Sequence, residues 1–347
     1  MRWDKLRLDE GAAGDSGPQP VPLFGLDAVA RTIDTPEFRG ITFHEVRAKS
    51  IINRVPDASR LPFRWTINPY RGCSHACAYC FARNTHTYLD MDAGHDFNTQ
   101  IVVKVNAPEL ARRELAGPRW RGEHVAMGTN VDCYQRAEGR YRLMPGIIGA
   151  LRDAANPFSI LTKGTLILRD LDLLCEAADV TDVGLNVSVG FVDKAISRSV
   201  EPGAPSPERR LGICAAMTAR GLRCGVLMGP VLPFLTDSPG QLEATVRLAA
   251  EAGAASVSPI VLHLRPGARE WFLRWLAATH PELLDRYHQL YGRGAYAPKA
   301  YQQQISERVA ALTVRYRVGR ASPYRARRIA PPPSPAAASA PVQLPLA

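Results

Sequence analysis

The sequence has no long hydrophobic run. Its 347 residues contain no stretch of about 18 consecutive apolar residues, the length that crosses a bilayer. The segment from Met1 to Lys5 also lacks the apolar centre of a secretory signal peptide. We therefore expect a cytoplasmic protein that makes no contact with a membrane. The reducing conditions of that compartment argue against a framework of disulfides.

Cysteine is scarce, with seven residues in the chain, but three of the seven stand close together. Cys73, Cys77 and Cys80 have the spacing C-x3-C-x2-C. Three thiolates on one short loop can hold a metal centre. The other cysteines each stand alone in an apolar segment, as small buried side chains do; they are Cys133, Cys175, Cys214 and Cys224.

Two kinds of metal centre suit the three cysteines. One is zinc, with His75 or His86 as the fourth ligand. Structural zinc usually takes its ligands from two separated pairs, and the sequence has no second C-x2-C and no H-x3-H. The other is a [4Fe–4S] cluster, which normally takes four cysteines, one for each iron. Three local cysteines would leave the fourth iron to a ligand that is not protein.

The net charge of +10 raises the question of a nucleic-acid partner. From Arg315 to Ala347 the chain has six arginines and no acidic residue, which leaves about +4 for everything before it. Such a basic run either contacts phosphates or simply remains solvated. Contact with nucleic acid therefore stays open.

Short apolar runs alternate with helical segments through the middle of the chain. Ser206 and Ser238 each precede a proline, which marks the start of a helix, and Gly221 and Gly253 stand where helices end. Six strand–helix units predict parallel strands with right-handed crossovers, hence an α/β barrel or open sheet. The predicted strands are 65–69, 124–129, 158–162, 183–189, 224–228 and 257–263.

Composition divides the chain into five parts. We expect a flexible leader over 1–22, an N-terminal extension that packs on the barrel over 23–60, and the barrel over 61–280. A C-terminal helical segment follows over 281–320, and a disordered tail rich in proline and alanine over 321–347. We expect the chain to be a monomer.

The cysteine spacing, with the aromatic Tyr79 before the third cysteine, resembles the signature of the radical S-adenosylmethionine (SAM) superfamily. Arg71 and Gly72 before the cysteines, and 81–83 after them, are similar to the branch that contains spore photoproduct lyase and its DNA-repair-photolyase-like relatives. The resemblance covers about residues 60–270. It implies a partial (β/α)6 barrel, a [4Fe–4S] cluster on the three cysteines, and SAM bound to the fourth iron. It also implies a reducing electron donor of the flavodoxin or ferredoxin type.

The resemblance also assigns residues at the strand ends to SAM. Asn130 and Asp132 follow the second strand and offer acceptors to the SAM amino group. Lys163 follows the third strand and is a compact charge for the methionyl carboxylate. Ser188, at the end of the fourth strand, would contact the same moiety or its ribose.

Four more residues are implied near the cofactor. Tyr79 and Phe81 flank the third cysteine, and such aromatic side chains either lie against adenine or shield the cluster from water. Arg198 and Glu201 resemble a segment that this branch carries before the helix that leads to its fifth strand. For these two, a structural ion pair is the alternative.

Cys133 is the candidate catalytic residue. Spore photoproduct lyase uses a cysteine near this strand end as a hydrogen donor, and Thr129 occupies that position here. Photolyase-like relatives place a hydroxyl residue before the aspartate and a proline after it, where this chain has Val131 and Cys133. The lyase activity is therefore not implied by the motif, and Cys133 is an alternative hydrogen donor.

The sequence thus predicts a radical SAM enzyme that cleaves SAM reductively and acts on an unidentified substrate. A nucleic-acid lesion is the leading candidate, by analogy with the branch. The alternative belongs to a different class of protein. It is a non-enzymatic zinc protein, in which the three cysteines and His75 hold the metal for structure or for partner binding.

Overall fold

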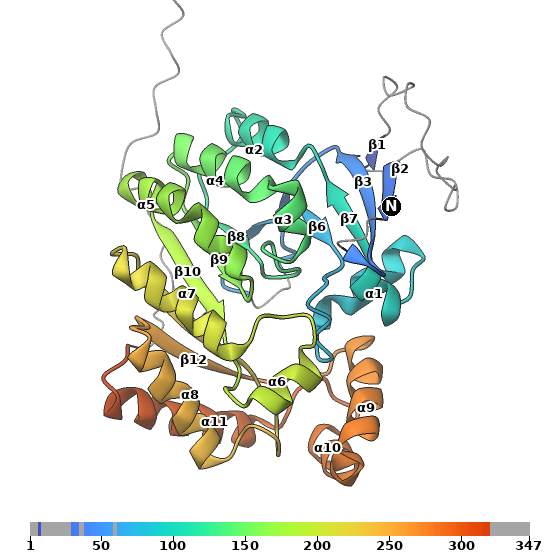
Figure 1. Ribbon diagram of the computed structural model, residues 1–347, viewed down its shortest axis with the longest axis vertical. Helices are drawn as coiled ribbons and strands as arrows, with labels where there is room; N and C mark the ends of the chain where they lie inside the picture. The colour runs from blue at the N-terminus through green and yellow to red at the C-terminus, as the bar shows by residue number, and fades with distance from the viewer. Residues whose placement is uncertain (1–5, 8–28, 35–37, 58–60, 320–347) are drawn as a thin grey trace, which may run out of the picture.

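The computed structural model describes residues 6–7, 29–34, 38–57 and 61–319 (Figure 1). The expected leader, apart from 6–7, and the expected tail lie outside the described residues. Among the residues described, no helix has the length and apolar character that a membrane span needs.

Six parallel strands form the main sheet. Along the sheet they follow one another in chain order, and the antiparallel strand β4 (Ile52–Arg54) pairs with the first of them. They are β5 (Trp65–Ile67), β8 (Val125–Met127), β9 (Phe158–Thr162), β10 (Val183–Ser188), β11 (Cys224–Val231) and β12 (Ser256–Val261). Each overlaps a strand predicted from the sequence. The predicted fold class, a partial (β/α)6 barrel, is therefore confirmed.

The main sheet is apolar on one face and partly polar on the other. In β10, Leu185 and Val187 are buried whereas Asn186 is half-buried, because successive residues of a strand point to opposite faces. The register places Asn186 beside Gly225 of β11 and places Gly225 beside Ser256 of β12. The face that carries Asn186 therefore combines small and polar residues with Leu161 of β9, which the register places beside Asn186.

Long helices flank the apolar face (Figure 1). They are α4 (Leu143–Asp153), α5 (Leu171–Val180), α7 (Pro207–Ala219), α8 (Pro239–Glu251) and α11 (Lys299–Arg315). Ser206 and Ser238 are N-caps, and each hydroxyl accepts a hydrogen bond of 3.3 Å from a backbone N–H three residues later. Gly221 and Gly253 follow the helix ends with φ of +77° and +74°, a conformation that glycine adopts without strain. The predicted helix boundaries are confirmed.

Further helices connect the strands, and others follow the last strand of the main sheet. Those between strands are η2 (Phe81–Thr85), η3 (Thr87–Leu89), α1 (His95–Thr99), α2 (Ala107–Leu115), α3 (Ala137–Tyr141), η4 (Thr165–Asp170) and α6 (Lys194–Val200). After β12 come α9 (Ala268–Thr279), η5 (Pro281–Leu283) and α10 (Leu284–Tyr291), followed by α11. The helical character expected for 281–320 is therefore present up to Arg315.

A second sheet, which the sequence analysis does not predict, adjoins the first. Its central strands are β3 (Thr42–Ala48) and β7 (Gln100–Lys104), which run parallel. β1 (Leu6–Arg7) and β2 (Val29–Asp34) pair with β3, and β6 (Tyr70–Arg71) pairs with β7, all antiparallel. β6 begins two residues after β5 leaves the main sheet, so the chain enters the cysteine motif at the junction of the two sheets.

Candidate active site

The cysteine loop, residues 72–80, begins directly after β6. Gly72 has a φ of +81°, and a Cβ there would lie 2.9 Å from the carbonyl oxygen of Gln100. Glycine is therefore required by both conformation and space. The N–H of Cys73 donates to the carbonyl of Phe97 at 2.9 Å. The first cysteine is thus fixed against the segment that leads into β7.

Arg83 holds the loop from behind. Its side chain is 0% exposed, and its Nε and Nη2 donate to the carbonyl oxygen of Cys77 at 3.2 and 2.9 Å. Its Nη1 donates to the carbonyl of Gly94 at 2.8 Å. The guanidinium lies 5.2 Å from the ring centre of Phe97 and 4.6 Å from that of Trp271. The planar fork of arginine donors thereby fixes the backbone of the middle cysteine.

The segment Val200–Gly203 holds the loop from the other side. The N–H of Ala78 donates to the carbonyl of Val200 at 2.8 Å, and the N–H of Gly203 donates to the carbonyl of His75 at 3.1 Å. A Cβ on Gly203 would lie 2.0 Å from the carbonyl oxygen of Ser74, so only glycine fits. The conformation of the cysteine loop is therefore fixed by hydrogen bonds from two parts of the chain, Arg83 and the segment Val200–Gly203.

The three thiols suit an iron–sulfur cluster. Burial raises the pKa of each, that of Cys77 to about 12, and the charges of Asp132 and of the other two cysteines raise the pKa of Cys73 further. The positive charge of Lys163 acts in the opposite direction and lowers the pKa of Cys77 and Cys80. Within 38–57 and 61–319, no three His, Cys, Asp or Glu side chains converge as ligands of one ion do. A cubane spreads its cysteines over separate irons.

Both histidines considered as zinc ligands contact other groups. His75 is buried in the cysteine loop, and its Nδ1 lies 3.3 Å from Oδ2 of Asp132. His86 is also buried; its Nε2 lies 2.9 Å from the carbonyl oxygen of Gln100 and its ring packs edge-on against Phe97. In each histidine, one ring nitrogen therefore already contacts a protein group and not a metal ion.

Asp132 connects the loop after β8 to the end of β9. Its carboxylate accepts hydrogen bonds from Thr162 Oγ1 at 2.6 Å, from the N–H of Lys163 at 2.7 Å and from the N–H of Tyr134 at 2.9 Å. Burial opposes its ionisation, but His75 and these donors lower its pKa to about 2. Asp132 is therefore a charged acceptor whose oxygens already have partners in the protein.

The structure brings together three of the residues that the sequence analysis assigns to SAM. Nζ of Lys163 donates to Oγ of Ser188 at 2.7 Å and lies 5.7 Å from the ring centre of Tyr79. The same Nζ lies 3.8 Å from Oε1 of Glu201. The cation at the end of β9 is thus held between a hydroxyl, an aromatic ring and a buried carboxylate.

Glu201 is the centre of a buried ion pair. Its carboxylate accepts from the hydroxyl of Tyr79 and from Nη2 of Arg210, and the Glu201 and Arg210 side chains are 0% and 1% exposed. Burial alone would raise the pKa of Glu201, but Arg210 and Lys163 hold it below the ordinary value. The partner is therefore Arg210, whereas Arg198 is exposed.

Sequence reasoning missed Arg83 and Arg210. A signal for Arg210 was present, because with Ile213, Cys214 and Met217 it completes the i, i+3, i+4, i+7 stripe of the buried face of α7. A charged residue in such a stripe indicates a buried partner. Nothing local distinguishes Arg83 from a surface arginine.

Three other predicted residues lie around this centre. Asn130 is half-buried in the loop after β8. Phe81 is 44% exposed, and the guanidinium of Arg265 lies 5.6 Å from its ring centre. Cys133 is 1% exposed, and burial followed by the charges of Asp132 and Glu138 raises its pKa well above the ordinary value. Its thiol therefore stays protonated.

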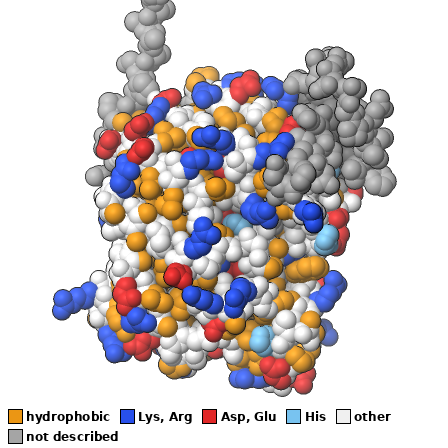
Figure 2. Space-filling model, in the orientation of Figure 1, with side chains coloured by type: hydrophobic (Ala, Val, Ile, Leu, Met, Phe, Trp, Pro, Cys, Tyr) orange, Lys and Arg blue, Asp and Glu red, His pale blue; other side chains and the backbone are white. Residues whose placement is uncertain are grey.

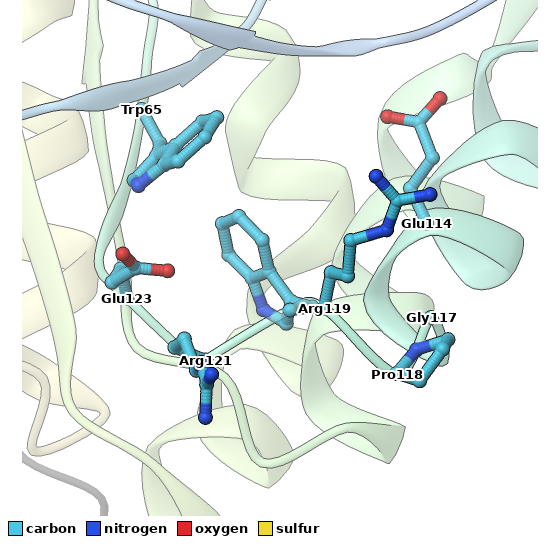
Figure 3. Close-up of a pocket in the computed structure, with 8 residues that line it drawn as sticks. Trp65, Glu114, Gly117, Pro118, Arg119, Arg121 and Glu123 are labelled. Atoms are coloured by element: carbon cyan, nitrogen blue, oxygen red, sulfur yellow. The ribbon is translucent and has the colours of Figure 1, made fainter.

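A pocket of about 300 Å³ lies away from this centre, at the N-terminal end of β5. Figure 3 shows Trp65 and Glu123 on one side of it and Arg119 pointing toward Glu114 on the other. None of the residues that the sequence analysis assigns to the cluster or to SAM lines this pocket. This pocket is therefore not part of the candidate site.

One relative with a similar sequence spans almost the whole chain, and another matches about half of it. An uncharacterized protein of Mycobacterium tuberculosis (strain H37Rv) is 51% identical over 346 residues, which is 99% of both chains. An uncharacterized protein of Methanocaldococcus jannaschii is 29% identical over 195 residues, 56% of this chain and 69% of its own.

Solved structures and a family profile agree with the geometry. A mutant of spore photoproduct lyase with bound AdoMet and dinucleoside spore photoproduct has a TM-score of 0.60 at 15% identity, covering 77% of this chain and 78% of its own. At that identity the likeness shows the fold alone. The profile described as "Radical SAM superfamily" matches residues 67–249, more than half of the chain, with the three cysteines inside the match. The chain belongs to the radical SAM superfamily.

Proposed function

We propose that the chain is a radical SAM enzyme that holds a [4Fe–4S] cluster on Cys73, Cys77 and Cys80. One observation carries the proposal. Two buried thiols, Cys73 and Cys77, and the half-buried Cys80 lie on one loop, and the charge of Lys163, which is hydrogen-bonded to Ser188, acts on Cys77 and Cys80. When bound, the cluster supplies the electron that cleaves SAM to methionine and a 5′-deoxyadenosyl radical.

The residues around the cysteine loop supply the charges that SAM needs. Lys163 provides a cation for the methionyl carboxylate. Ser188 positions the Lys163 side chain by accepting a hydrogen bond from its Nζ. Glu201, kept ionised by Arg210, balances the charge of Lys163 in the absence of the cofactor. Asn130 offers an amide oxygen to the SAM amino group.

The two aromatic residues beside the third cysteine take different roles in this proposal. Tyr79 is buried and its hydroxyl is used by Glu201, which suits shielding of the cluster from water. Phe81 remains 44% exposed, which leaves its ring available to adenine.

For the substrate we propose a damaged base in nucleic acid, and the polar face of the main sheet supports this class. A Cβ on Gly225 would lie 2.4 Å from Oδ1 of Asn186 and 2.8 Å from Oγ of Ser256, so both polar groups reach the same space. An asparagine amide matches the paired donor and acceptor of a nucleobase edge, the edge that a base exposes when it is flipped out of its stack. The dinucleoside spore photoproduct bound to spore photoproduct lyase is a ligand of the same class.

Surface charge gives less guidance. Figure 2 shows basic and acidic side chains interspersed over the face it presents.

Anaerobic reconstitution with iron and sulfide tests the enzyme proposal. We expect about four irons per chain, a broad absorbance near about 400 nm, and 5′-deoxyadenosine when SAM and a reductant are added. Replacement of any one of the three cysteines by alanine should abolish all three signals. Stoichiometric zinc that survives air, with no uptake of iron, would refute the proposal and favour the zinc protein.

The substrate class is tested by the yield of 5′-deoxyadenosine. Ultraviolet-irradiated oligonucleotides should raise the yield above the background without substrate, and undamaged oligonucleotides should not. An equal yield with both would rule out a lesion substrate while leaving SAM cleavage intact.

A further inference from the structure

A second pocket lies on the outer side of the cysteine loop. It has a volume of about 320 Å³, and Ala76 and Ala78, the two residues on either side of Cys77, form part of its lining. The rest of the lining includes Trp271, Arg274 and Trp275 of α9. Because alanine has the smallest side chain with a Cβ, little protein separates this surface from the middle cysteine.

Arg83 connects the pocket to the cluster site through direct contacts. Its guanidinium donates to the carbonyl of Cys77 at 3.2 and 2.9 Å on one side and stacks 4.6 Å from the ring centre of Trp271 on the other. A Cβ on Gly94 would lie 2.5 Å from the Trp271 ring, so that ring is held flat against the backbone. The half-exposed indole of Trp271 therefore contacts Arg83, and Arg83 in turn positions the backbone of Cys77.

The surface has the composition of a protein interface. Tryptophan and arginine are enriched at the centres of interfaces, and among the described residues no carboxylate lines this pocket. Arg274 is exposed, and Arg198, exposed on α6, adjoins the lining residue Ser199. Slight burial opposes ionisation of Asp92, but hydrogen bonds from the backbone lower its pKa, so this exposed carboxylate stays charged within reach of Arg274. Two of these three exposed charges, Arg274 and Arg198, are basic, so the charge at the pocket is basic on balance.

We propose that this pocket is the docking surface for the electron donor, a small acidic flavoprotein or ferredoxin. The inference rests on the proposed function, since only a cluster on the three cysteines needs such a donor. One electron leaves the reduced carrier of the donor and enters the oxidised cluster; no bond forms or breaks. The aromatic floor accepts the apolar rim of the carrier, and Arg274 and Arg198 pair with carboxylates around it.

Binding to the chain without its cluster gives the first test. The probe is a purified flavodoxin, immobilised, and binding is measured by biolayer interferometry at low and at high salt. We expect Arg274→Glu to weaken binding about tenfold at low salt, with a smaller effect at high salt. The matched control is Arg308→Glu on α11, also exposed and absent from the pocket lining. Equal affinity of the wild type, Arg274→Glu and Arg308→Glu would overturn the proposal.

A second pair of variants tests the pocket itself. Ala278 lines the pocket and Ala277 does not, although both are exposed on α9. Ala278→Glu should fill the pocket and repel an acidic donor, whereas Ala277→Glu should bind flavodoxin as the wild type does. Both substitutions suit an exposed helix position, so both proteins should fold. Equal loss of binding in the two variants would also contradict the proposal.

The choice of reductant separates this inference from the proposed function. With dithionite, a small reductant that needs no docking, the reconstituted Ala278→Glu variant should produce 5′-deoxyadenosine at the wild-type rate. With reduced flavodoxin it should lose about tenfold. Loss with both reductants would contradict the docking role. Absence of product from the wild type with dithionite would instead refute the radical SAM activity on which the inference rests.

Discussion

The buried pair of Glu201 and Arg210 allows a quantitative test of the site. Glu201→Gln removes the negative charge while preserving the size of the side chain. Arg210, 1% exposed, then keeps its charge with the carbonyls of Pro205 and Ser188 as acceptors but has lost the carboxylate that balances it. Removing one partner of a buried ion pair costs about 3–5 kcal/mol, because the remaining charge is left uncompensated.

The reverse substitution should cost less. In Arg210→Met, the Glu201 carboxylate keeps the Tyr79 hydroxyl and has Lys163 at 3.8 Å, so part of its charge remains balanced. The double variant should lose about 2 kcal/mol less than the sum of the two single losses, the coupling expected of side chains in one network.

Urea unfolding of the chain without its cluster, followed by tryptophan fluorescence under reducing conditions, measures these differences. Glu208→Gln is the control, because Glu208 pairs with Lys194 at 2.9 Å while both side chains remain largely exposed. Such a surface pair should contribute less than about 1 kcal/mol. A loss in Glu201→Gln no larger than in Glu208→Gln, or an additive double variant, would refute the assignment of Glu201 as a buried counter-ion.

Three further predictions follow from single positions. Gly203→Ala should prevent retention of iron in reconstitution assays, since its Cβ would lie 2.0 Å from the carbonyl of Ser74, whereas Gly212→Ala on α7, with open space around its Cβ, should retain it. Lys163→Met should weaken SAM binding about tenfold or more in equilibrium dialysis, because a charge-assisted contact is lost, and Lys194→Met should not. Burial lowers the pKa of Lys104 to about 7. Between this pKa and the higher pKa of Lys104 in the unfolded chain, the unfolded state binds one proton more than the folded state. The wild type should therefore gain about 1.4 kcal/mol of stability per pH unit, relative to Lys104→Met, as the pH rises. Plots of unfolding free energy against pH that run parallel for the two proteins would contradict this.

The parts of the fold that the sequence predicted depend on local patterns. The strands of the main sheet are short apolar runs, and two of the helices between them have a clear start signal, Ser206 and Ser238. The second sheet has no comparable signal. β6 has two residues, and β3 pairs with β7 in parallel across more than 50 residues of chain. Such pairing is decided by packing against the rest of the molecule and not by the strand itself.

The candidate site divides in the same way. The cysteines were predictable because their spacing is local, and Lys163 and Ser188 because strand ends of a parallel sheet meet at one edge. Arg83 and Arg210 were missed, because they act through contacts with carbonyls and side chains that folding brings from elsewhere. The assignment of residues to SAM stays a prediction, as does the role of Cys133.

Cys133 as a hydrogen donor is open to a direct isotope test. Its thiol is buried, and its raised pKa keeps it in the S–H form that a hydrogen donor needs. A thiol hydrogen exchanges with solvent, so in D2O a donor at Cys133 should place deuterium in the product. Cys133→Ala should lose that label, while Cys175→Ala, a half-buried cysteine on α5, should keep it. If Cys133→Ala forms the product and incorporates deuterium as the wild type does, Cys133 is a packing residue and not a hydrogen donor. It interacts electrostatically with both Tyr70 and Cys73.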